Sequence, residues 1–94
     1  KTVAPFQVHL LDLGQKKESE KIYQDLQKDG IEVLYDDRAD KTAGEKFAEA
    51  DLIGIPIRLV VSERTLKKNA VEIKKRAEQK TKLIKIKGLL TYVK

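Results

Sequence analysis

The 94-residue sequence predicts an α/β fold: a mixed, mainly parallel five-stranded sheet flanked by three helices. Two observations predict it. Over residues 3–61, short apolar segments alternate with two segments of helical character, and this β-α-β-α-β order requires parallel strands joined by right-handed crossovers. Beyond residue 70, two alternating segments add antiparallel strands at one side of the sheet. Because no linker or repeat interrupts this order, residues 1–94 are expected to form a single domain.

The first strand is expected within Val3–Leu13. Its apolar residues occupy both parities, with Val8 and Leu10 on one and Leu11 and Leu13 on the other. A short segment that is apolar on both faces is typical of a central strand covered on both sides.

The first helix is expected at Gln15–Asp29, where the apolar period changes. One stripe recurs at i, i+3, i+4 and i+7, and its members are Ser19, Ile22, Tyr23 and Leu26. Gly30 follows where a left-handed residue ends many helices.

The second strand is expected at Ile31–Tyr35, which is rich in β-branched and aromatic residues. After a loop at residues 39–44, a short helix is expected at Glu45–Ile53. Its predicted inward side chains are Phe47, Ala50 and either Leu52 or Ile53.

The third strand is expected at Ile57–Val61, after Gly54 and Pro56 have ended the second helix. Two further strands are expected at Val71–Lys74 and Leu83–Ile86, separated by a polar turn at residues 77–81. A last helix is expected to begin at residue 88.

The composition excludes several kinds of site. Without cysteine there is no disulfide, no thiolate metal site and no cysteine nucleophile, and with His9 as the single histidine neither a usual zinc site nor a Ser-His-Asp triad is plausible. His9 itself is interpreted as a sheet residue with satisfied hydrogen bonds rather than as a base. The isolated glycines provide no phosphate-binding loop, which disfavours a flavodoxin-like or nucleotide-binding domain.

Asp36 and Asp37 lie where the second strand ends, at the edge where α/β proteins usually place their function. Paired acids of this kind could hold magnesium. The favoured interpretation is that they close the loop and pair with Arg38. We therefore expect no catalytic site and no metal in this chain.

The charge is distributed unevenly, with −3 on residues 1–62 and +8 on residues 63–94. A basic C-terminal third favours a polyanionic partner, and a solvated lysine surface is the alternative. No apolar segment reaches the roughly 20 residues that span a bilayer, and no signal peptide opens the sequence, so the cytoplasm is the expected location and no membrane partner is expected.

Basic residues on adjoining strands resemble a platform for single-stranded nucleic acid. The aromatic residues are few, and Phe6, Tyr23 and Phe47 are expected in the core. Base recognition by hydrogen bonds is therefore favoured over recognition by stacking. The expected contacts are an arginine to guanine and a carboxylate that accepts from a guanine edge.

Three strings carry a family resemblance: Ala4–Leu10 (APFQVHL), Gly30–Arg38 (GIEVLYDDR) and Ala43–Pro56 (AGEKFAEADLIGIP). Together they resemble the anticodon-binding domain of class II aminoacyl-tRNA synthetases, specifically of prolyl-tRNA synthetase. The resemblance covers nearly the whole chain. The sequence departs from the family at Ser62 and Asn69, which stand where glycines are usual.

The resemblance implies recognition of the proline anticodon, whose second and third bases are guanines. The positions that match the family's recognition residues are Asp51, Arg58, Arg64 and Thr65, with Lys74 and Arg76 as further candidates. For Asp51 and Arg58, the alternative is an ion pair on the surface without a role in binding.

The resemblance also implies a parent protein. This chain would be a C-terminal fragment of a proline–tRNA ligase, and the parent is expected to be a homodimer. Its separate catalytic domain would use ATP with magnesium, while the domain itself needs no cofactor. A free-standing domain of this fold, acting as an accessory or protein-interaction subunit, is the alternative.

Overall fold

The computed structural model describes residues 6–75, 80–89 and 91, and it contains a five-stranded sheet in the order β2-β1-β3-β4-β5. The strands are β1 (Val8–Asp12), β2 (Val33–Asp36), β3 (Ile57–Val61), β4 (Ala70–Lys75) and β5 (Lys82–Lys85). β1 pairs in parallel with β2 and β3, whereas β3–β4 and β4–β5 are antiparallel. The predicted mixed sheet is therefore confirmed, including its two antiparallel additions.

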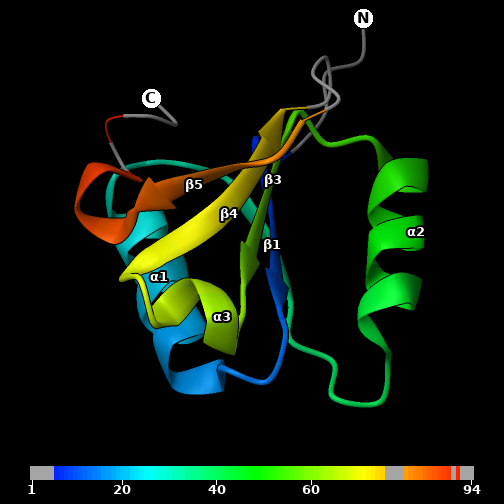
Figure 1. Ribbon diagram of the computed structural model, residues 1–94. Helices are drawn as coiled ribbons and strands as arrows, with labels where there is room; N and C mark the ends of the chain where they lie inside the picture. Colours follow the sequence, from blue (N-terminus) through cyan, green and yellow to red (C-terminus); the bar gives the residue numbers. More distant parts are fainter. Residues whose placement is uncertain (1–5, 76–79, 90, 92–94) are drawn as a thin grey trace, which may run out of the picture.

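Helices cover both faces of the sheet. They are α1 (Lys16–Lys28), α2 (Ala43–Ile53), α3 (Glu63–Leu66) and the 3-10 helix η1 (Ile86–Gly88). Figure 1 shows α1 and α3 on one face and α2 alone on the other. The sequence did not predict α3, and most of the predicted last helix, like the polar turn, falls outside the described residues.

The main core lies between the sheet and α1. Its largest fully buried side chains include Leu10, Leu59 and Ile73 from the strands and Leu26 from the helix. All five residues of β1 are buried, as expected for a central strand with both faces covered. The predicted helical stripe also faces this core, because Ser19 and Ile22 are buried and Tyr23 packs against it.

The opposite face has a smaller core. Leu11, Ala50 and Val60 are buried there, with Leu13 and Phe47 packed against them. The predicted inward position of Leu52 or Ile53 is wrong, because these side chains are 87% and 53% exposed. The helical phase instead turns Lys46 inward, and its Nζ donates a hydrogen bond of 2.5 Å to the backbone carbonyl of Asp12.

Two residues at the family's usual glycine positions have local roles. Asn69 adopts the left-handed region (φ +52°), which asparagine tolerates better than most residues. Ser62 is the N-cap of α3, and its side chain accepts from the Thr65 N–H. Both substitutions are therefore compatible with the turns that hold α3.

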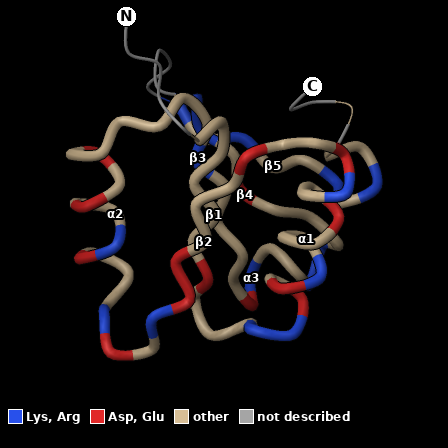
Figure 2. Tube along the Cα trace, turned by 180° about the vertical axis from the view of Figure 1, so that it is seen from behind, with Lys and Arg blue, Asp and Glu red and all other residues tan. Residues whose placement is uncertain are grey.

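The basic C-terminal third lies at the β4–β5 side of the sheet, away from β2. Figure 2 shows basic segments around these outer strands and acidic segments where β2 ends. The positive charge predicted from the sequence is therefore collected at one edge of the fold. Among the described helices, none is both long and apolar enough to cross a membrane.

Candidate functional site

The connection between α2 and β3 brings a carboxylate and a guanidinium together. Gly54 has the left-handed conformation (φ +72°) at the end of α2, and its N–H donates to the carbonyl of Ala50 at 2.9 Å. Residues other than glycine pay a steric cost in this conformation. The tight reversal at Gly54 allows Asp51, in the last turn of α2, to meet Arg58, the second residue of β3.

The Asp51–Arg58 pair is close but loose. Oδ1 of Asp51 lies 3.6 Å from Nη1 of Arg58, which is within ion-pair range but longer than a good hydrogen bond. The Asp51 side chain is 74% exposed and that of Arg58 is 17% exposed. In addition, Nε of Arg58 is buried and has no hydrogen-bond partner among the described residues. The pair therefore retains hydrogen-bonding capacity that a ligand could use.

Phe47 supports the guanidinium of Arg58. It lies on α2 one turn before Asp51, and the Cζ atom of Arg58 is 4.8 Å from the centroid of its ring. A guanidinium over an aromatic face gains a favourable cation–π interaction. The sequence placed Phe47 in the core, and the structure adds that this half-buried ring also orients Arg58.

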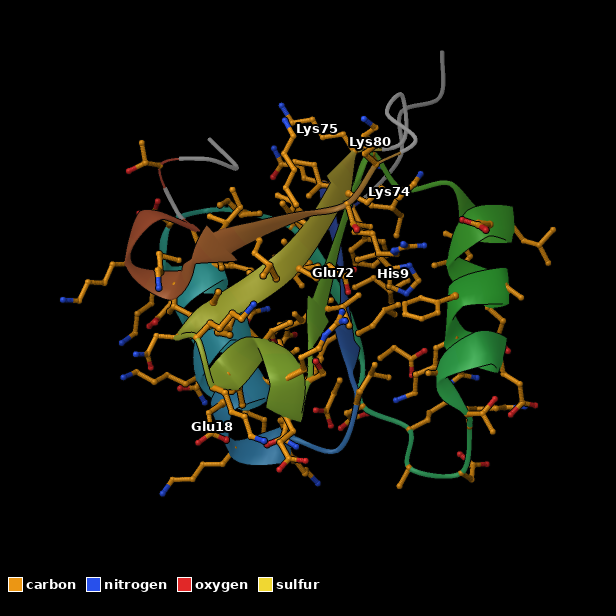
Figure 3. The ribbon with its side chains drawn as sticks, viewed as in Figure 1. His9, Glu18, Glu72, Lys74, Lys75 and Lys80 are labelled. Carbon is orange, nitrogen blue, oxygen red and sulfur yellow. The ribbon has the colours of Figure 1, made fainter. Side chains whose placement is uncertain are left out.

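A cavity of about 100 Å³ lies beside this pair. Its polar or charged lining residues are His9, Asp51, Arg58 and Lys74, and its other lining residues are Ala50, Gly54 and Ile55. Three of the four are neighbours across the sheet, because Arg58 pairs in register with His9 on β1 and with Lys74 on β4. Figure 3 shows His9 and Lys74 on the side that faces α2, whereas Lys75 points away from α2. We call this cavity the β3 pocket.

His9 is 3% exposed, and burial lowers the pKa of its imidazole below the usual 6.5. The interpretation of a satisfied sheet residue is wrong for one ring atom, because Nδ1 has no hydrogen-bond partner among the described residues. The sequence offered no signal for this, since the register that places His9 next to Arg58 is a property of the assembled sheet.

Arg64 does not line the β3 pocket. It lies on α3, its side chain is 77% exposed, and Nη2 is 4.0 Å from Oε1 of Glu72. Glu72 is two residues before Lys74 on β4 and so projects from the same face. The Arg64 guanidinium therefore lies near Glu72, although α3 itself lies on the face opposite α2.

Thr65 is fully buried and its hydroxyl is engaged within the polypeptide. Its Oγ1 donates to the carbonyl of Ser62 at 3.0 Å and accepts from the Ser62 N–H at 3.1 Å. The bond from the Ser62 N–H, together with the bond from the Thr65 N–H to the Ser62 side chain, forms the capping box of α3. The structure thus gives Thr65 a role in shaping the loop that carries Arg64, and Arg76, the remaining candidate, lies outside the described residues.

Replacing Thr65 with valine is expected to lower the free energy of unfolding by about 1–2 kcal/mol, because the Ser62 N–H and carbonyl lose their shared partner. Urea denaturation measures this loss. Thr65→Ser keeps the hydroxyl and should be milder. Unchanged stability of the valine variant would contradict the capping role.

The predicted pairing of Arg38 with a neighbouring acid is confirmed for Asp36. Nε and Nη2 of Arg38 each donate to the carboxylate of Asp36 at 2.9 Å, and Nη2 also contacts Glu49 on α2. These contacts connect the end of β2 to α2. Both carboxylate oxygens of Asp36 accept hydrogen bonds from the guanidinium, which disfavours the interpretation of Asp36 as a magnesium ligand. Within the described part of the chain, no three acidic, histidine or cysteine side chains come close enough together to hold a metal ion.

The Arg38 hydrogen bonds hold the pKa of Asp36 below its ordinary value. A carboxyl whose pKa is lowered by folding stabilises the fold above its unfolded pKa of about 4, and this stabilisation is lost as the pH falls through the folded pKa. We therefore expect the wild type to lose stability between about pH 5 and pH 3 more steeply than Asp36→Asn. Chemical denaturation at several pH values measures the two slopes, and equal slopes would contradict the pairing.

A larger cavity of about 460 Å³ lies at the carboxyl ends of β1 and β2, where open α/β sheets commonly bind ligands. Its charged lining includes Lys16, Arg38 and Lys46 with Asp12 and Asp37. Asp12 is already occupied, because its Oδ1 accepts from the Gln15 N–H and the Ser19 hydroxyl. The loop lacks the glycines of a phosphate-binding turn, so the β3 pocket is the better candidate site.

Comparisons with known proteins agree with this fold. The family profile described as "Anticodon binding domain" matches residues 2–94. A proline–tRNA ligase of Bacillus mycoides (strain KBAB4) is 43% identical over 98 residues, covering 99% of this chain and 17% of that protein. A proline–tRNA ligase of Legionella pneumophila (strain Corby) is 43% identical over 97 residues, covering 97% of this chain and 17% of that protein. This chain thus spans about a sixth of the length of these relatives.

A solved structure is similar throughout the chain. Prolyl-tRNA synthetase from Cryptosporidium parvum, determined with L-proline and AMP, superposes with a TM-score of 0.87 at 28% identity over 97% of this chain and 21% of that one. The family profile, the relatives and the fold agree, so the chain belongs to the anticodon-binding domain family, in the form found in prolyl-tRNA synthetases.

Proposed function

We propose that this chain is the anticodon-binding module of a proline–tRNA ligase and that the β3 pocket binds a guanine of the proline anticodon. The observation that carries the proposal is the pair of Asp51 and Arg58 at the mouth of the pocket. The two groups are near enough to contact one base, yet their 3.6 Å separation leaves hydrogen-bonding positions for it.

The chemistry of this pair suits guanine. A carboxylate accepts hydrogen bonds only, and guanine offers its N1–H and N2–H groups on one edge. A guanidinium donates only, and guanine presents O6 and N7 as acceptors. Adenine carries an amino group where guanine has O6, so Arg58 would face a donor and the pocket would reject adenine.

Backbone contacts are proposed for the basic edge around the pocket. Lys74 lines the pocket itself, and Lys75, Lys80, Lys82 and Lys85 are on or next to the outer strands. Arg64 is proposed as an additional contact from α3, and Arg76 stays a prediction. Thr65 is proposed to act only through the loop that it caps. Cations in these positions would neutralise phosphates without reading sequence.

The activity of the whole enzyme belongs to the rest of a longer polypeptide in this proposal. Such a parent would activate proline with ATP and magnesium in a separate catalytic domain and charge the tRNA. Dimerisation of the parent and a cytoplasmic location are parts of the same proposal. This chain would supply tRNA recognition, and no catalytic residue is assigned to it.

The proposal is tested by fluorescence anisotropy with a labelled proline-anticodon stem-loop over a range of salt concentrations. We expect binding whose logarithmic affinity falls linearly with the logarithm of salt, because phosphate contacts release counterions. A stem-loop of equal length with an unrelated anticodon lacking guanine is the control and should bind more weakly at every salt concentration. Equal binding of the two would contradict base recognition, and absence of binding to both would contradict the RNA-binding function.

A further inference from the structure

We propose that His9 is a third recognition group of the β3 pocket and that its imidazole accepts a hydrogen bond from a base N–H. This inference rests on the proposed function, because it identifies a further contact for the same ligand. His9 lies on β1, directly beside Arg58 in the sheet register, and it lines the cavity together with Asp51 and Lys74.

The unpaired nitrogen is the observation that points to a ligand. Nδ1 of His9 is buried and lacks a hydrogen-bond partner among the described residues, and the same is true of Nε of Arg58. Leaving a buried polar atom unpaired is costly, and native structures pair the great majority of such atoms. Both nitrogens belong to side chains that line the β3 pocket, and His9 also lines a second cavity beside Asp36, Arg38 and Glu49. A polar group that enters the β3 pocket would offer a partner to both nitrogens after a small adjustment of the two side chains.

The surroundings of His9 favour the neutral ring. Burial lowers its pKa, and the cations Arg58 and Arg38 lower it further, while Asp36 and Glu49 act in the opposite direction. The pocket also presents Lys74 from β4 and Asp51 from α2. At neutral pH the ring therefore carries one donor and one acceptor nitrogen.

An acceptor complements the donors already in the pocket. Arg58 and Lys74 can only donate, and Asp51 is the acceptor on the opposite, solvent-exposed side. A second acceptor on β1 would allow the buried end of the pocket to receive a base N–H. Protonation would convert this acceptor into a donor and would place a third cation beside Arg58 and Lys74, so binding and protonation should oppose one another.

The direct test uses nuclear magnetic resonance, because His9 is the single histidine and its ring signals need no assignment by mutation. The pKa of the imidazole is measured in the chain with and without saturating guanine-containing stem-loop. We expect binding to lower it by about 1, which corresponds to roughly tenfold tighter binding by the neutral form. The chain's affinity should fall correspondingly as the solution is acidified. An unchanged or raised pKa in the complex would overturn the inference.

Variants separate a contact from a purely structural role. His9→Phe, which keeps a flat ring without nitrogen, should bind the stem-loop roughly three- to tenfold more weakly and lose the pH dependence between about pH 5 and 7. His9→Gln, with an amide oxygen as acceptor, should recover part of the affinity without the pH dependence. A His9→Phe variant that melts like the wild type and keeps its affinity and pH profile would also overturn the inference.

Failure of this inference is distinguishable from failure of the proposed function. Suppose that the wild type prefers guanine, that Arg58→Ala loses this preference, and that the pKa of His9 is the same with and without RNA. In that case only the proposed role of His9 is wrong. If the wild type binds guanine and adenine stem-loops equally, the proposed function itself is wrong, and the role of His9 falls with it.

Discussion

Replacing Arg58 with alanine is expected to weaken binding of the proline-anticodon stem-loop by about 1–3 kcal/mol and to reduce discrimination between guanine and adenine. The reason is geometric. Arg58 is the guanidinium donor that lines the β3 pocket, where it lies over the Phe47 ring and within ion-pair range of Asp51. Anisotropy with guanine and adenine stem-loops measures the affinity and the discrimination.

The matched controls for Arg58→Ala are Lys75→Ala on β4 and the conservative change Arg58→Lys. Lys75 lies one residue from the Arg58 partner Lys74 but points away from α2, so Lys75→Ala should weaken both stem-loops alike. Arg58→Lys retains charge without the planar fork and should lose discrimination more than affinity. An Arg58→Ala variant that keeps its preference for guanine would show that the β3 pocket does not read the base.

Replacing Leu59 with alanine is expected to lower the free energy of unfolding by about 2–5 kcal/mol. Leu59 follows Arg58 on β3 but points to the opposite face, where it is fully buried in the main core against α1. Removing its branched end leaves a cavity in a region that packs at crystal-like density. Urea denaturation followed by circular dichroism measures the loss.

Leu52→Ala is the matched control, because it makes the same chemical change at a side chain that is 87% exposed. Its effect should stay within about 0.5 kcal/mol. A loss of similar size at both positions would contradict the assignment of the main core to the α1 face.

The strands were predictable because their patterns reflect where they lie in the sheet. β1 is apolar on both parities and is covered on both faces, whereas β4 alternates, with Val71 and Ile73 buried on one face and the charged Glu72 and Lys74 half-buried on the other. The helix α3 was not predicted because a segment of four residues is too short to show the repeating apolar pattern of a helix. Its signal was the capping pair Ser62 and Thr65, which is visible in the sequence as two hydroxyl residues three positions apart.

The inner face of α2 was only half predictable. Phe47 and Ala50 face inward as expected, yet Lys46 replaces Leu52 and Ile53 as the buried neighbour. The pattern of a short helix with few apolar residues does not determine which side chains face the core. In α2, the hydrogen bond from Lys46 to the Asp12 carbonyl compensates the cost of burying the Lys46 ammonium group.

The candidate site came from the resemblance more than from physical patterns. General reasoning favoured the basic outer strands as a nucleic-acid platform and a structural pairing of Asp36 with Arg38, which the structure shows, but it did not single out Asp51 and Arg58. The resemblance pointed to Asp51 and Arg58, which the structure brings together. The position of His9 beside them depends on long-range strand pairing, which no local pattern encodes.

The most direct test of the central claim compares the affinity of the unmodified chain for two stem-loops that differ only by guanine-to-adenine changes in the proline anticodon, at one fixed salt concentration. If Asp51 and Arg58 read guanine, the guanine stem-loop should bind more tightly by about 1–3 kcal/mol, roughly five- to 150-fold. Equal affinity for the two stem-loops would contradict the claim.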